Sequence, residues 1–332
     1  MDVAIIGSKR SGKLFLKGMI HTKEFGVFCA LLLLIIIMSI ASPYFLGTHN
    51  IFNVLRNMST IGIMSIGVTM IIITGGIDLS VGSLLAVSGM VTARMMYFGV
   101  NPLIAFIGGL LMGTVLGAIN GLIITRIKVN PFITTLGMLS IGRGLTFLLA
   151  TGIRGSVASN IGMKNPTINF LGGGYIGVVP FPVIEMFILV ILFTYFLKYT
   201  VLGRQVYATG SNMEAARLSG VRVKNVQLFV YTLTGTLCGL AGIMSGGLIE
   251  TAATNAGTGT ELDVIAAVVI GGTSLSGGEG TIVGAIIGAA IMAILKNAFV
   301  LLHLPAFVQT IAIGVVIILA VATDTMRNKN HK

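Results

Sequence analysis

Few residues in this 332-residue chain could take part in chemistry, and the carboxylates of Asp78 and Asp263 are the main candidates. Asp78 lies in a glycine-rich break between two apolar runs, and Asp263 lies at the start of another run. A carboxylate at membrane depth is costly, so it is a functional candidate by default, as a carrier of a coupling ion or as part of a transport path. Structural alternatives stay open: Asp78 could cap the helix that begins near Ser80, and Asp263 could face a helix dipole.

No arrangement of residues indicates catalysis. The four histidines are scattered, without a metal-ligand spacing such as HExxH, so no metal site is expected. The segment 7–13 has the spacing of a phosphate-binding loop, but Leu14 stands where Ser or Thr must coordinate magnesium. A membrane enzyme and a nucleotide site on this chain are therefore disfavoured.

The composition is that of an integral membrane protein. The chain is 55% hydrophobic and 9% charged, with a mean hydropathy of +1.00, whereas soluble domains carry about 25% charged residues. The net charge of +11 could suggest nucleic acid, but its placement in short segments between apolar runs does not. Cys29 and Cys238 both fall inside apolar runs and are interpreted as small buried hydrophobic residues.

Ten apolar runs predict an all-α, polytopic integral membrane protein. The predicted helices are 25–42, 58–74, 83–98, 103–125, 131–150, 183–199, 227–249, 262–275, 281–301 and 306–323. Ten crossings place both termini on one side, and most of the 21 basic residues then fall on that side, which predicts cytoplasmic termini. The resulting organisation is a cytoplasmic tail 1–24, a transmembrane domain 25–325 and a cytoplasmic tail 326–332.

Glycine spacing predicts how the helices pack. Gly residues recur every fourth position at 109, 113, 117 and 121, and again at 280, 284 and 288, which is typical of close helix–helix seams. The segments 75–82 and 271–278 are similar Gly-rich breaks after β-branched runs, and they suggest an internal duplication. Broken helices in corresponding halves are pointers to a transport path.

Two polar segments connect the predicted spans. The outer segment 151–182 is rich in Gly, Asn and Pro, and it could be a short helix or folded flap, or a plain connector. The cytoplasmic segment 200–226 holds a charged, helix-prone island at 203–220. A membrane protein has no general need for such an insert, so a partner outside the bilayer is expected to contact it.

Within this island, Glu214-Ala215-Ala216 followed by Gly220 resembles the EAAxxxG pattern of ABC importer permeases. The motifs GGIDLSVGSLLAVSG (75–89), NGLIITRIKVNPFITTLGMLSIGRG (120–144) and GTGTELDVIAAVVIGGTSLSGGEGTIVGAIIGA (257–289) narrow the resemblance to the monosaccharide permeases, and among them to ribose permeases. The resemblance implies an island that docks on an ATPase. The residues expected to couple to it are Gly210, Asn212, Glu214, Ala215, Ala216, Arg217 and Gly220. The Glu214 carboxylate is not invariant in the family, so it need not be essential.

The resemblance also implies the assembly. The expected partners are a second copy of this chain, one or two ABC ATPase subunits, a periplasmic or lipid-anchored sugar-binding protein and the lipid of a bacterial plasma membrane, with no nucleic acid. ATP and magnesium would be bound by the ATPase partners and no cofactor by this chain.

Alternating access driven by ATP is the expected mechanism. The residues predicted to line the path are Asp78, Ser80, Asn120, Asn130, Thr134 and Thr135. Three alternatives stay open: an ion-coupled secondary transporter that uses Asp78 or Asp263, an ABC permease for another small polar solute, and a passive channel or scaffold.

Overall fold

The computed structural model describes residues 23–151 and 159–329. The helices are α2 (Lys23–Ala41), α3 (Thr48–Ile73), α4 (Val81–Tyr97), α5 (Pro102–Leu122) with the π-helical turn η1 (Ile123–Ile127), α6 (Pro131–Ala150), α7 (Pro166–Gly173), α8 (Phe181–Tyr199), α9 (Val201–Ser211), α10 (Met213–Leu218), α11 (Val223–Leu248), α12 (Thr260–Ile270), α13 (Ile282–Leu301) and α14 (Ala306–Lys329). The strands are β1 (Asn160–Gly162), β2 (Tyr175–Ile176), β3 (Val179–Pro180) and β4 (Thr251–Ala253). The phosphate-loop spacing at 7–13 and most of the predicted tail 1–24 lie outside the described residues.

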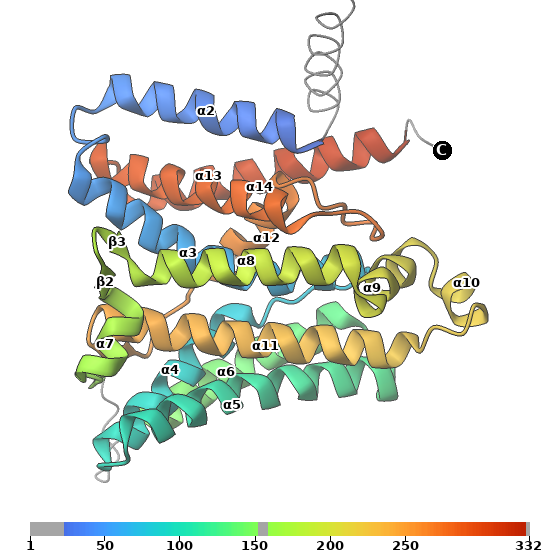
Figure 1. Ribbon diagram of the computed structural model, residues 1–332, viewed down its shortest axis with the longest axis horizontal. Coiled ribbons are helices and arrows are strands. Elements are labelled where there is room, and N and C mark those ends of the chain that lie inside the picture. Colours follow the sequence, from blue (N-terminus) through green and yellow to red (C-terminus); the bar gives the residue numbers. More distant parts are fainter. Residues whose placement is uncertain (1–22, 152–158, 330–332) are drawn as a thin grey trace, which may run out of the picture.

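The long helices lie side by side in stacked rows (Figure 1). The short helices α9 and α10 are at one end of these rows, and α7, β2 and β3 are at the opposite end. The beginning of α2 and the end of α14 lie toward the α9 end. The two ends of the described chain therefore share the side that carries the charged island.

The helices confirm an all-α polytopic membrane protein, apart from two small two-stranded sheets. Among the described residues, seven helices are long and apolar enough to cross a membrane. These are Glu24–Ala41, Thr48–Ile73, Pro102–Ile127, Pro131–Ala150, Phe181–Tyr199, Val223–Leu248 and Ile282–Leu301, and two shorter apolar helices are Val81–Tyr97 and Ala306–Ala322.

The second predicted span, 58–74, begins too late. Helix α3 starts at Thr48 because the polar turn that carries Asn53, Arg56 and Asn57 is helical. Residues spaced three and four apart share one face of a helix, so these side chains project together and not into the surrounding lipid. A helix boundary predicted from apolar runs alone leaves out a first turn with a polar face, which is why the predicted span begins at 58.

The eighth predicted span, 262–275, ends too late. Helix α12 stops at Ile270, and its 11 residues rise only about 16 Å, less than the roughly 30 Å hydrocarbon core of a bilayer. Gly271 and Gly272 follow the helix, and Gly272 ends it because its backbone is in the left-handed region, with φ +91°. The chain then runs without helix to α13.

The two Gly-rich breaks end their helices in the same way. Gly75, like Gly272, is left-handed, with φ +80°. In each break the next N–H bonds to a carbonyl five residues earlier, Gly76 to Ile71 at 3.0 Å and Thr273 to Val268 at 3.2 Å. The breaks therefore share a local geometry that is shifted by one residue from the predicted alignment of 75–82 with 271–278. The internal duplication itself stays a prediction.

The glycine seams pack helices, as predicted. A Cβ added at Gly113 or Gly117 would collide with the backbone of α11, at Gly235 and Tyr231 respectively. Gly284 and Gly288 hold α13 equally close to α12. Gly280 differs, because it precedes α13 and packs on Thr273.

Helix α3 forms the centre of the protein. Its second half is fully buried, and it packs against α8, α11, α12 and α13. Cys238 on α11 is buried, as predicted, whereas the same prediction for Cys29 is wrong: it is exposed on the peripheral helix α2. A Cys in an apolar run can face lipid as well as protein, since both surroundings are apolar.

Candidate coupling site

The charged island folds as two short helices with defined ends. The Thr200 hydroxyl accepts a hydrogen bond from Gly203 N at 3.0 Å and caps α9. The Asn212 side chain accepts one from Ala215 N at 2.9 Å and caps α10. Gly220, with φ +87°, reverses the chain after α10. Local sequence thus fixes both helices without help from the bilayer.

Helix α10 projects almost all of its surface outward. Of its six residues only Ala216 is buried, while Leu218 is 76% exposed. Glu214 and Arg217 form an exposed ion pair at 2.5 Å, and Arg217 lowers the pKa of Glu214 by hydrogen bonding and charge. A short capped helix that exposes both charged and apolar side chains has the surface expected of a docking element.

Helix α9 contacts both glycine-rich breaks. A Cβ at Gly210 would overlap the carbonyl oxygen of Ile73, at the end of α3, and would lie 2.6 Å from Gly278 N, in the second break. The second break is also bonded to the end of α3, because Gly278 N donates to Ile73 O at 2.8 Å. One turn away, the Tyr207 hydroxyl donates to Gly280 O at 2.8 Å. Helix α9 therefore meets the end of α3, directly before the first break, and the second break in one backbone contact.

Of the predicted path residues, Asp78, Ser80 and Asn120 lie together and are fully buried. Asp78 Oδ1 accepts hydrogen bonds from the Ser80 backbone N at 2.8 Å and from its hydroxyl at 2.6 Å, and Asn120 Nδ2 donates to the same hydroxyl at 3.0 Å. Asp78 therefore bonds within the turn that precedes α4, and helix α4 itself begins after Ser80 without a side-chain cap hydrogen bond, so the predicted cap is wrong. Asp78 Oδ2 and Asn120 Oδ1 are buried without a hydrogen-bond partner in the described residues.

The other three predicted path residues lie at the start of α6. Asn130 is exposed and caps the helix, accepting from Phe132 N at 2.9 Å. Thr134 and Thr135 are buried, and their hydroxyls donate mainly to backbone carbonyls one turn earlier. The Thr135 hydroxyl also lies 3.5 Å from Ile77 O, which connects it to the first break.

Sequence reasoning missed the partner of Asp263. Lys296 on α13 donates to Asp263 Oδ2, with the two side chains 32% and 3% exposed. Asp263 is therefore an ion-pair partner and not simply a residue facing a helix dipole. The signal was available, because a lysine inside an apolar span needs a counter-charge.

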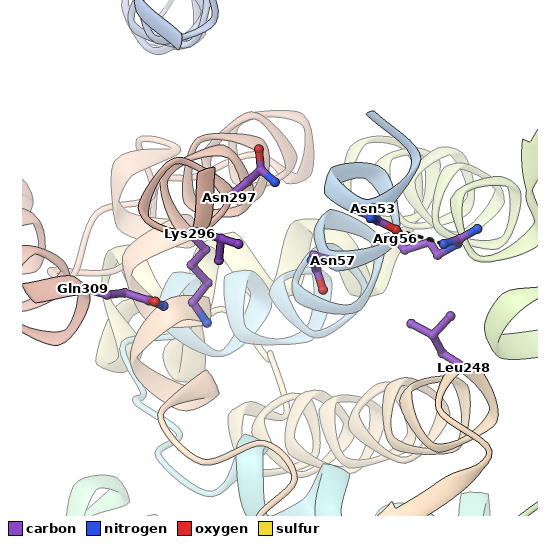
Figure 2. A pocket seen from close by; sticks show the side chains of 8 residues that line it. Asn53, Arg56, Asn57, Leu248, Lys296, Asn297 and Gln309 are labelled. Carbon is purple, nitrogen blue, oxygen red and sulfur yellow. Dashed lines mark hydrogen bonds between the residues drawn. The ribbon is translucent and has the colours of Figure 1, made fainter. Parts of the chain in front are cut away.

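A polar chamber of about 420 Å³ beside Lys296 was also missed. Figure 2 shows its side chains converging from four helices. They are Asn53, Arg56 and Asn57 of α3, Leu248 of α11, Lys296, Asn297 and Val300 of α13, and Gln309 of α14. None of the predicted path residues lines it.

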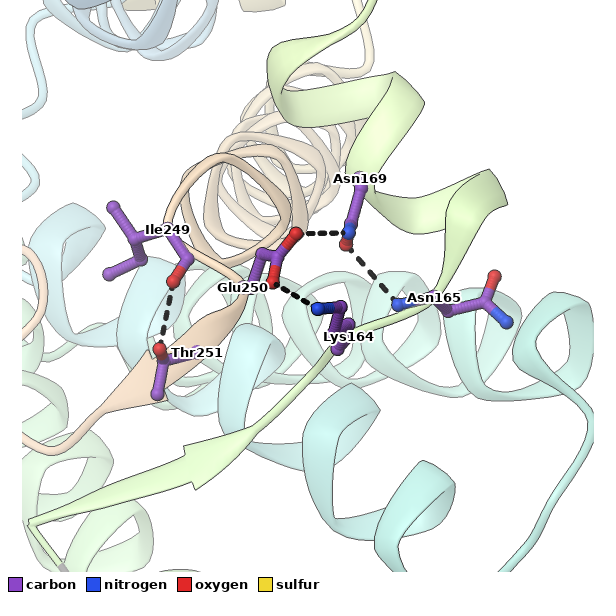
Figure 3. Close-up of polar contacts among 6 residues, drawn as sticks. All are labelled: Lys164, Asn165, Asn169, Ile249, Glu250 and Thr251. Atoms are coloured by element: carbon purple, nitrogen blue, oxygen red, sulfur yellow. Dashed lines mark hydrogen bonds and ion pairs between the residues drawn. The ribbon is translucent and has the colours of Figure 1, made fainter.

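The segment 151–182 is folded where it is described, so the plain-connector alternative is wrong for that part. Strand β1 pairs with β4, and α7 packs on α11. Figure 3 shows Glu250, after α11, joined to Asn169 at 2.8 Å and to Lys164 at 3.7 Å. Tyr175 of β2 reaches Arg56 at the chamber by a hydrogen bond and by ring stacking, 5.1 Å from centroid to guanidinium carbon.

Known proteins of one kind, transport permeases, are similar to this chain over nearly its whole length. The family model described as "Branched-chain amino acid transport system / permease component" matches residues 50–321. The ribose import permease protein RbsC of Escherichia coli K12 is 44% identical over 298 residues, which are 90% of this chain and 92% of the relative. The Bacillus subtilis ribose import permease is 42% identical over 308 residues (92% and 94%), and the D-allose transport system permease AlsC of E. coli is 38% identical over 308 residues (92% and 93%). No solved structure matches.

Proposed function

We propose that this chain, which belongs to the branched-chain amino acid transport system / permease component family, is the membrane-spanning subunit of a bacterial ABC importer. Its cargo is ribose or a related aldose, and it resides in the inner membrane as a multi-pass protein. The similarity to ribose import permeases over nine-tenths of the chain carries this conclusion. The chain transports and does not catalyse; ATP and magnesium belong to the ATPase partners.

The proposed topology has ten crossings with both termini in the cytoplasm. The shared side of the described ends and of α9 and α10 supports it (Figure 1), as does the distribution of basic residues. Helix α12 is too short to cross alone, so in this topology the non-helical chain after it completes the crossing. Such non-helical backbone is tolerated where protein buries it, and Thr273 and Ser274 are buried.

The proposed assembly is a homodimer of this chain with ABC ATPase subunits on the cytoplasmic side and a sugar-binding protein on the other. Helix α10, with Glu214, Ala215, Ala216 and Arg217, docks on the ATPase. Its exposed Met213 and Leu218 provide apolar contacts there. Asn212 and Gly220 define the ends of the docking helix, and Gly210 connects it to the membrane domain.

Coupling then works through α9. When the ATPase subunits close on ATP, they move α10, and α9 moves with it because only Asn212 separates the two helices. Gly210 touches Ile73 and Gly278 with no side chain between, so this displacement is delivered directly to both breaks. Gly-rich, left-handed turns are the places where a membrane helix can change direction at least cost.

The translocation path is proposed to pass the first break, along Asp78, Ser80, Asn120, Asn130, Thr134 and Thr135. The support is the pair of buried acceptors without hydrogen-bond partners, Asp78 Oδ2 and Asn120 Oδ1. Acceptors of this kind suit sugar hydroxyls, which donate. Weak binding is expected along the path, because tight binding would slow release.

An ion-coupled transporter is the competing function. It requires a carboxylate that can exchange a proton or Na⁺, and Asp263 is already occupied by Lys296. Of the two predicted carriers, Asp78 keeps one carboxylate oxygen without a hydrogen-bond partner in the described residues. An ABC permease for another small polar solute is the other alternative.

The deciding experiment is affinity purification of the tagged chain from its own membrane, followed by reconstitution. Recovery of an ATPase and a sugar-binding protein, together with ATP-dependent uptake of labelled ribose into proteoliposomes, is the expected result. Uptake by the chain alone, driven by a proton or Na⁺ gradient, would replace the ABC assignment by ion coupling.

A further inference from the structure

The chamber beside Lys296 has the lining of a binding site for a small polyhydroxylated molecule. Six of its eight lining residues are polar, and four of these are amides. An amide both donates and accepts, as does a sugar hydroxyl. Leu248 and Val300 supply apolar surface of the kind that contacts the C–H face of a sugar ring.

Several lining groups are held in place by neighbours and form fixed walls. Asn297 exchanges reciprocal amide hydrogen bonds with Asn50, at 3.0 and 2.7 Å. Arg56 donates to Asn53 Oδ1 at 3.2 Å and stacks on Tyr175. Preorganised polar groups avoid part of the ordering cost of binding.

Other groups remain available to a ligand. Lys296 has three N–H donors and directs one to Asp263. Asn57 is exposed, and Gln309 lies beside Lys296 (Figure 2).

The charge of the site disfavours a cationic ligand. Lys296 is neutralised by Asp263, so Arg56 carries the remaining positive charge, and it already stacks on Tyr175. No carboxylate lines the chamber. The site can therefore hold a polyol without attracting protons or metal ions.

We propose that this chamber is a transient monosaccharide-binding site of the permease itself, on the side where the binding protein delivers its cargo. This inference rests on the proposed function. The chamber lies near the start of α3 and the end of α13, at the end of the helix rows opposite α9 and α10 (Figure 1). The sugar is held there before it passes to the first break.

The test is protection of a cysteine in the assembled transporter. Asn57→Cys is made in a Cys29→Ser background, with the buried Cys238 left in place, and is labelled in proteoliposomes with a membrane-impermeant maleimide from the binding-protein side. Val178→Cys, at the exposed turn between β2 and β3, is the control on the same side. Ribose at tens of millimolar should slow labelling at position 57 several-fold and leave position 178 unchanged.

A second variant tests whether the Gln309 amide binds the sugar by a hydrogen bond. Gln309→Leu should raise the half-protecting ribose concentration about five- to tenfold, the effect of one lost hydrogen bond of about 1 kcal/mol. Gln227→Leu makes the same change on α11 away from the chamber and should have no effect. Stronger protection by ribose 5-phosphate than by ribose would overturn the neutral-sugar assignment in favour of an anion site.

ATP-dependent ribose uptake by the Cys29→Ser parent is measured in parallel, so that two failures stay distinct. Uptake without protection at position 57 refutes the chamber and leaves the proposed function intact. Absence of ribose uptake by the parent, with both partners assembled, refutes the proposed function.

Discussion

Replacing Gly210 by alanine should disconnect the ATPase from the membrane helices. The added Cβ would overlap Ile73 O and lie 2.6 Å from Gly278 N, below the 3.0 Å that real Cβ contacts respect. Both opposing groups are backbone, so no side chain can rotate away. Helix α9 must instead move outward by about an ångström, and overpacking of this kind costs about 1–3 kcal/mol.

The same movement strains the bond between the second break and the end of α3, Gly278 N to Ile73 O at 2.8 Å, which contributes about 1 kcal/mol. Together these two costs raise the free energy of the arrangement in which α9 contacts Ile73 and Gly278 by about 2–4 kcal/mol, which lowers the population of that arrangement at least tenfold. We expect ATP-dependent ribose uptake by the reconstituted complex to fall at least tenfold. ATP hydrolysis should persist but lose its stimulation by the sugar-loaded binding protein.

Gly137→Ala is the matched control, because it adds the same methyl group within an apolar helix where nothing lies within 4 Å. It should retain uptake. Yield in the membrane and thermal stability in detergent separate loss of coupling from loss of folding. Wild-type uptake and wild-type ATPase stimulation in a folded Gly210→Ala complex would refute the direct contact as the coupling route.

Three further predictions concern single groups. Lys296→Met should destabilise the protein by about 3 kcal/mol, because it leaves the Asp263 carboxylate, which is 3% exposed, without a counter-charge. Asp263→Asn should destabilise it less, and the double variant should recover part of the loss. Equal melting temperatures for the two single variants would contradict this. Asp78→Asn keeps an acceptor for Ser80 and should retain ATP-driven uptake, whereas an ion-coupled transporter would lose it. Glu214→Gln should leave the melting temperature unchanged at neutral pH, since exposed ion pairs contribute little. The pKa of Glu214 is lowered, mainly by its hydrogen bond with Arg217. The pair is therefore present above the usual carboxyl range and is lost as pH falls through the lowered pKa. Binding of the ATPase, measured by surface plasmon resonance against pH, should accordingly lose its pH dependence below the usual carboxyl range in the Glu214→Gln variant.

The sequence predicted the elements well where one physical signal dominated. Apolar runs located a helix at each of the ten predicted places, but only seven of the described helices are long and apolar enough to cross a membrane. The fourfold Gly spacing at 109–121 predicted a seam, and the structure places that seam against α11. The boundaries failed where a second requirement competed, as at the polar first turns of α3, where amides and Arg56 face a chamber.

Long-range partners were beyond a reading of one sequence. Lys296 inside an apolar span signals the need for a counter-charge, but the sequence does not identify Asp263, 33 positions away, as the residue that provides it. The contact of Gly210 with Ile73 and Gly278 joins three segments far apart along the chain. The complete burial of Asp78 likewise depends on segments far apart along the chain, such as Asn120 of α5, which bonds to the neighbouring Ser80.

The placement of the two breaks explains why so short a docking helix can be sufficient. A displacement of α10 need not pass through flexible side chains, because α9 meets both breaks backbone to backbone at Gly210. Rigid contacts transmit small movements with little loss, since packed interiors are only slightly compressible. The second break is also bonded to the end of α3 through Gly278 N and Ile73 O, so the end of α3 and the second break should respond together. One movement on the ATPase side would then change the direction of α3 and α13 in concert, and the far ends of these two helices form the walls of the polar chamber.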